Sequence, residues 1–136
     1  MTHQRGFSLI EALIALVVLS IGLIGVAAMQ LKALQSATAG YQRSVVTLAA
    51  VDAQERLWVE LAREGVDSCA DINIEADWKT QWFADSDTNP LRNINEEGSG
   101  IERRGCEFTI EIDMGSRTGN TESDVFAYTL RLPELE

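Results

Sequence analysis

An uncharged apolar segment near the N-terminus limits what this chain can fold into. Ala12–Leu31 contains no charged residue, and Ser20 and Gln30 are its only polar side chains. As an α-helix the segment would measure about 30 Å, which is the thickness of the hydrocarbon core of a bilayer. The sequence therefore predicts a helix that can span a membrane once.

The flanks of this segment distinguish it from a cleaved secretory signal. The apolar run continues into Lys32 without the small-residue cleavage site that signal peptidase needs. His3 and Arg5 precede the segment, whereas almost all acidic residues follow it. By the positive-inside rule, we expect a cytoplasmic N-terminus and an exported C-terminal part.

One carboxylate, Glu11, lies directly before the uncharged segment. A charge at membrane depth is costly unless a partner neutralises it, and an amine is the expected partner. The alternative is a plain anchor in which Glu11 reaches the headgroup region, because polar side chains near the ends of a span extend toward water.

The residues around Glu11 resemble a known protein family. The segment Gly6–Leu16 is similar to the N-terminus of type IV prepilins and of type II secretion pseudopilins, and Val17–Gln30 is most similar to minor pilins of the PilV-like group of pilus modification proteins. The resemblance implies that a prepilin peptidase cleaves after Gly6 and methylates the new N-terminal Phe7. It also implies that Glu11 acts in assembly.

Cleavage would expose a cationic amine on Phe7, which an incoming subunit would offer to the Glu11 carboxylate of a neighbour. Desolvation offsets much of this attraction, so the pair would select the register of the helices more than it would stabilise them. Ser20, Gly22 and Gly25 reduce side-chain bulk and permit close approach of helices.

The same resemblance implies a division of the chain into a leader (1–6), a transmembrane or filament-core helix (7–31) and an exported head (32–136). The partners would be prepilin peptidase, the inner-membrane pilus assembly machinery, and major and minor pilin subunits. The protein would cross the inner membrane once and then reach the pilus at the cell surface, where it would support pilus assembly, adhesion or motility. A minor pseudopilin of a type II secretion system is the nearest alternative, and a membrane-tethered periplasmic binding or sensing module is an alternative of another class.

Beyond the apolar segment the helical pattern continues to Glu64. Lys32–Glu64 contains no proline, and Gly65 is a plausible C-terminal stop, so the sequence predicts one helix over Phe7–Glu64. Gly40 would be its weak point, because an interior glycine costs about 1 kcal/mol relative to alanine. Large apolar residues at helical spacing are expected to form its buried face in the head: Leu34, Tyr41, Val45, Leu48, Val51, Trp58 and Leu61.

The C-terminal part of the chain alternates in the manner of half-buried strands. One strand is predicted over Cys106–Met114, and a second carries Phe126, Tyr128, Leu130 and Leu132 on one face. Asp71–Gly100 is expected to be a connecting region that contains a short helix over Glu75–Ala84 and buried aromatic residues. These elements predict an α+β fold in which a long N-terminal helix packs on a small antiparallel sheet, a layout that resembles a type IV pilin.

The two cysteines, Cys69 and Cys106, lie in the part assigned outside the cytoplasm. An oxidising location favours a disulfide over a metal site or a catalytic thiol. The bond would tie the end of the long helix to a strand and would contribute about 3 to 4 kcal/mol in the chain-entropy model. Two reduced, buried thiols are the alternative.

Sequence features of other function classes are weak. Asp85, Asp87, Asn89 and Glu96 match the ligand spacing of an EF-hand, but Pro90 occupies the position that needs glycine. The one histidine, His3, falls in the predicted leader, so no metal, cofactor or catalytic residue is expected and the chain is not expected to be an enzyme. A formal net charge of −10 also opposes direct binding of nucleic acid.

Overall fold

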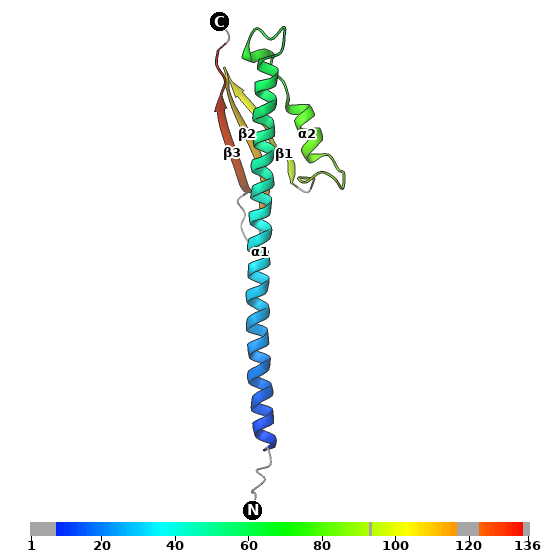
Figure 1. Ribbon diagram of the computed structural model, residues 1–136, viewed down its shortest axis with the longest axis vertical. Helices are drawn as coiled ribbons and strands as arrows, with labels where there is room; N and C mark the ends of the chain where they lie inside the picture. Colours follow the sequence, from blue (N-terminus) through cyan, green and yellow to red (C-terminus); the bar gives the residue numbers. More distant parts are fainter. Residues whose placement is uncertain (1–7, 93, 117–122, 135–136) are drawn as a thin grey trace, which may run out of the picture. The chain divides into compact units, whose positions relative to one another are not determined.

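The structure is a computed structural model that describes residues 8–92, 94–116 and 123–134. Met1–Tyr41 and Gln42–Glu136 form two compact units. The elements follow one another in the order α1 (Leu9–Leu61), η1 (Cys69–Asp71), α2 (Glu75–Phe83), β1 (Asn95–Arg104), β2 (Glu107–Ser116) and β3 (Ser123–Arg131) (Figure 1). The α+β fold with a long N-terminal helix and a small antiparallel sheet is confirmed.

Helix α1 accounts for almost all of the described part of the first unit. Among the described residues it is the one helix that is long and apolar enough to cross a membrane. Its large apolar side chains between Leu9 and Leu34 are all exposed, on every side of the helix. A helix that is apolar all round is stable only where lipid or other helices surround it.

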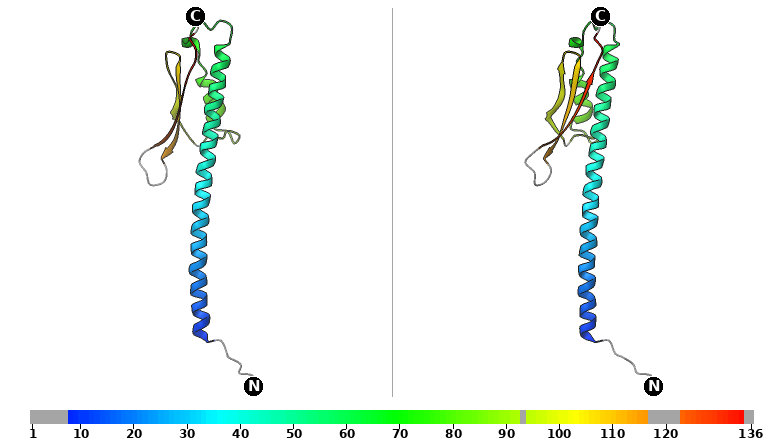
Figure 2. Two further views of the ribbon diagram at one scale, coloured as in Figure 1. Left: turned by 60° about the vertical axis from the view of Figure 1, so that its left-hand side comes forward. Right: turned by 90° about the vertical axis from the view of Figure 1, so that its left-hand side faces the viewer.

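In the second unit, residues 42–61 of α1 pack against the sheet (Figure 2). The Tyr128 hydroxyl of β3 donates to Gln54 Oε1 at 2.6 Å, and Arg43 lies 3.6 Å from Asp124. The buried side chains of this part of α1 recur at helical spacing and are mostly small: Val45, Val46, Ala49, Ala50, Ala53 and Leu57. Small side chains let the sheet and α2 come close to the helix backbone.

This burial pattern corrects the buried face expected from the sequence. Val45 is buried and Leu61 is partly buried against the core. The other expected positions are exposed: Leu34, Tyr41, Leu48, Val51 and Trp58. The prediction followed the larger apolar side chains at helical spacing, whereas α1 buries three alanines together with Val45, Val46 and Leu57, and Trp78 of α2 with Ile110 and Ile112 of β2 packs in the same core.

Helix α2 was predicted over Glu75–Ala84, and the structure places it over Glu75–Phe83. Trp78 is fully buried, and its indole Nε1 donates to the Ala49 carbonyl of α1 at 2.9 Å. Phe83 packs edge-on against Trp78, with ring centroids 5.4 Å apart. The aromatic residues of α2 therefore belong to the core, as the sequence indicated.

The sheet has three antiparallel strands in the order β1-β2-β3. The sequence predicted β2 and β3 but placed residues 95–100 in a connecting region, and that part of the prediction is wrong. β1 escaped prediction because it carries one large apolar residue, Ile101, among glycine and charged residues. Its polar composition is typical of an edge strand, which natural sheets protect from pairing with other chains.

Strand β2 buries Phe108, Ile110 and Ile112 on the predicted face. Asp113 was expected on the solvent face but is buried. Its Oδ2 accepts from Asn95 Nδ2 at 2.8 Å, and its Oδ1 accepts from the Gly115 N–H at 2.9 Å. A Cβ at Gly98 would lie 2.6 Å from Asp113 Oδ2, so the register shift of β1 requires glycine there.

Helix α1 ends at Leu61, three residues before the predicted end at Glu64. The Arg63 N–H still donates to the Glu60 carbonyl at 3.1 Å, a three-residue spacing that is typical of a tighter last turn at the end of an α-helix. Gly65 has a φ of +90°, which fits its predicted role as the point where the chain leaves the helix. Ser68 and Asp71 then cap the short helix η1 reciprocally.

Candidate functional site

Glu11 lies in the first turn of α1 and its side chain is exposed. Its N–H donates to the Ser8 carbonyl at 3.0 Å, and the Ala12 N–H donates to the same carbonyl at 3.2 Å. A carboxylate in the first turn interacts favourably with the positive end of the helix dipole. Among the described residues, no cation lies within ion-pair distance of Glu11.

The surroundings of Glu11 are apolar. From Leu9 to Leu31 it is the one charged side chain, and the next polar group, the Ser20 hydroxyl, donates to the Leu16 carbonyl at 2.7 Å. That hydroxyl is therefore satisfied within the helix and places no demand on lipid or on a neighbour. As the one charged side chain in this stretch, Glu11 has the largest cost in an apolar environment unless a partner neutralises it.

Two glycines, Gly22 and Gly25, interrupt the bulk of this helix surface. A Cβ built at either position would have no neighbouring atom within 4 Å. The missing side chains would permit close approach of another helix to the backbone at these positions.

Gly6 and Phe7, the predicted cleavage and methylation residues, lie outside the described residues. The leader proposed for residues 1–6 lies outside them as well. The geometry of the described site therefore begins at Ser8, and it includes Glu11 but neither residue of the cleaved bond.

The disulfide expected between Cys69 and Cys106 is present, with a Cα–Cα distance of 5.3 Å. Cys69 belongs to η1, as expected near the end of the long helix, but Cys106 lies in the turn between β1 and β2 and not in a strand. The Cys106 carbonyl also accepts from the Leu132 N–H at 2.9 Å. The disulfide and this hydrogen bond together link three segments of the second unit that are far apart in the sequence.

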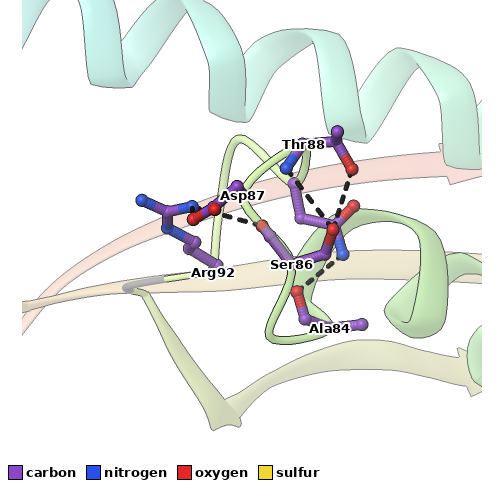
Figure 3. Close-up of polar contacts among 6 residues, drawn as sticks. Ala84, Ser86, Asp87, Thr88 and Arg92 are labelled. Atoms are coloured by element: carbon purple, nitrogen blue, oxygen red, sulfur yellow. Dashed lines mark hydrogen bonds and ion pairs between the residues drawn. The ribbon is translucent and has the colours of Figure 1, made fainter.

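The acidic loop that resembles part of an EF-hand has other partners within the chain (Figure 3). Asp87 forms an ion pair with Arg92, and the Ser86 and Thr88 hydroxyls lie 2.9 Å apart. Asn89 Nδ2 donates to the Ala84 carbonyl at 2.6 Å. Within the described residues, no group of three or more His, Cys, Asp or Glu side chains is arranged to hold a metal ion.

Residues 1–27 match the prokaryotic N-terminal methylation motif. No curated protein and no solved structure gives a significant match to the chain. The motif includes Gly6, Phe7 and Glu11, and together with the apolar helix it supports a type IV pilin-like or pseudopilin protein that is anchored in a membrane. Such a motif suggests a structural protein rather than an enzyme.

The structure also contains an exposed apolar face on α1, and three of its residues, Leu48, Val51 and Trp58, were expected to be buried. In the second unit, Leu48, Val51, Trp58 and Val59 of α1 are exposed. Their helical spacing was visible in the sequence, but spacing does not tell whether a partner lies inside or outside the chain.

Proposed function

We propose that this chain is a minor type IV pilin of the PilV-like group. Prepilin peptidase cleaves it after Gly6 and methylates Phe7. The mature subunit crosses the inner membrane once, with its N-terminus on the cytoplasmic side, and is then incorporated into the pilus or its initiating tip complex. There it supports pilus assembly, and through the pilus it supports adhesion or motility.

The observation that carries this proposal is the position of Glu11 within the matched methylation motif, as the one charge between Leu9 and Leu31. In the assembled state its carboxylate forms an ion pair with the N-terminal amine of Phe7 of a neighbouring subunit. The apolar faces of the helices supply most of the adhesion, and the ion pair penalises a wrong stagger, since an unpaired charge in an apolar core is costly.

Mass spectrometry of the mature N-terminus tests processing. We expect a chain that begins with N-methylated Phe7, and a chain in which residues 1–6 are retained would contradict the proposal. A retained N-terminus is the result expected of a membrane-tethered binding or sensing module, so the same measurement separates these two function classes.

The variant Glu11→Gln tests assembly, because it keeps the size of the side chain and removes the charge. We expect normal processing and membrane insertion but at least a tenfold loss of the subunit from purified filaments. Glu97→Gln is a matched control, since Glu97 is an exposed carboxylate on β1. Equal incorporation of the Glu11→Gln variant and the control would overturn the assembly role of Glu11.

A deletion strain separates a pilus from a secretion system. Loss of surface pili with normal secretion is expected for a minor pilin. Loss of secretion with normal pili would instead assign the chain to the pseudopilins, which share every N-terminal feature discussed above.

A further inference from the structure

The head contains an open pocket of about 220 Å³ that the assembly role does not use. It lies between the last turns of α1 and the start of α2, entirely within the second unit. Its lining comes from two segments: Glu55, Arg56, Val59 and Glu60 of α1, and Asn73, Ile74 and Asp77.

The pocket has an apolar wall that continues onto the exposed face of α1. Ile74 is buried, whereas Val59 is 68% exposed. Val51, Glu55 and Val59 are spaced by four residues and therefore share one side of the helix, with Trp58 beside them. An exposed apolar strip that leads into a pocket is typical of a protein interaction site, and an exposed tryptophan is a common anchor of such sites.

The charges around the pocket are unbalanced. Its single cation, Arg56, is already held by Asp52, with Nε 2.8 Å from Oδ2, and by Gln81. Glu60 pairs with Arg63 at 3.1 Å. No cation among the described residues pairs with Glu55 or Asp77, and both of these exposed carboxylates line the pocket.

We propose that this pocket binds a lysine side chain of another protein, within a segment that also carries apolar residues. The methylene groups of the lysine would lie on Val59 and Ile74, while its ammonium group would lie between Glu55 and Asp77. A flexible stem with a compact charge and three donors suits separate carboxylates, whereas a guanidinium is better matched to a single carboxylate that binds it through two parallel hydrogen bonds. The net charge of −10 would also attract a basic partner at long range.

An NMR titration of the full chain in detergent micelles tests this site. The probe is the peptide acetyl-Ala-Leu-Lys-Leu-Ala-amide, and a control peptide carries glutamine in place of lysine. We expect the lysine peptide to shift the amide signals of Val59, Asn73 and Asp77, and the control peptide to bind at least tenfold more weakly. Equal binding of the two peptides, or no shift at these residues, would overturn the proposal.

A pair of double variants separates this site from general attraction to an acidic protein. The double variant Glu55→Gln with Asp77→Asn should weaken binding of the lysine peptide at least tenfold. The double variant Glu96→Gln with Glu97→Gln removes the same amount of charge from β1 and should change binding of the peptide less than twofold. An unchanged indole signal of Trp78 would show that the core is intact in both. Equal weakening of peptide binding by the two double variants would overturn the proposal. Amide signals that shift with protein concentration in the absence of peptide would also overturn it, because they would assign this face to a second copy of the chain. These outcomes do not depend on processing or on Glu11.

Discussion

Residues 9–31 and residues 42–61 belong to the same helix, yet they differ in which apolar side chains they carry and in what covers them. The first stretch is rich in leucine, isoleucine and valine, and all of these side chains are exposed. The second stretch buries three alanines, two valines and one leucine, while Leu48 is 61% exposed and Trp58 is 43% exposed. Hydrophobicity alone therefore did not indicate burial within the chain.

The difference has a physical reason. A helix that is apolar on all sides has no preferred face toward its own chain, and its partners are lipid or other helices. A helix that packs on a sheet needs one face that fits the side chains already there, and small residues allow the closest approach. The two stretches thus serve two environments, one outside the molecule and one inside it.

Replacing one leucine in each stretch gives the largest contrast. Leu57 is fully buried, so Leu57→Ala should lower the free energy of unfolding by about 2 to 5 kcal/mol, because it removes contacts and leaves a cavity. Leu23 is exposed, and Leu23→Ala should change the free energy of unfolding by less than about 0.5 kcal/mol. Urea unfolding in micelles, followed by tryptophan fluorescence, measures both values, and similar losses would break the comparison.

Removing the disulfide should destabilise the second unit, which contains the second stretch, and leave the first stretch unchanged. The variant Cys69→Ser with Cys106→Ser should lower the free energy of unfolding of the head by about 2 to 4 kcal/mol, because the open loop has more conformational entropy when unfolded. Amide hydrogen exchange should rise in the sheet and remain unchanged at residues 12–31. Faster exchange in both regions would show that the stretches are coupled.

Enlarging a buried alanine tests whether the alanine face sets the approach of the sheet. Ala53 is fully buried, so Ala53→Leu should destabilise the head by about 1 to 3 kcal/mol through overpacking, in the same unfolding assay. The control is Thr47→Leu, because Thr47 lies on the exposed side of the same helix. A neutral Ala53→Leu variant would show that the core has space that the structure does not reveal.

The smallest expected effect lies near the boundary between the two stretches. Gly40→Ala should stabilise the helix there by about 0.5 to 1 kcal/mol, since alanine has less backbone freedom to lose and its Cβ would meet no described atom within 4 Å beyond its own turn of helix. Slower hydrogen exchange of the neighbouring amides would report the gain. Ala37→Gly should have the opposite effect, and equal exchange in the two variants would contradict this expectation.

Much of the architecture could be predicted from local patterns. The uncharged segment, the absence of proline up to Glu64, and the alternation in β2 and β3 each follow from contacts between residues that are close in the sequence. β1 could not be predicted, because an edge strand with Gly98, Ser99 and Gly100 carries little apolar signal. Asp113 was predicted on the solvent face but is buried, and its hydrogen-bond partner Asn95 is distant in the sequence.

The candidate site divides in the same way. Glu11 is prominent in the sequence because a lone carboxylate beside twenty uncharged residues stands out without any structure. The pocket between α1 and α2 could not be anticipated, because it exists only where Val59 and Ile74 come together. Local spacing carries no information about which distant segments meet.

By itself, the sequence determined a long helix, an apolar segment able to cross a membrane, and two strands of the sheet, because each depends on side-chain periodicity along a continuous stretch. Only the tertiary structure decided which face of α1 is buried, where β1 pairs and which carboxylates face the pocket. Those features depend on the shapes and polar groups of segments far apart in the chain, and alanine, glycine and serine reveal little of their role until a neighbour packs against them.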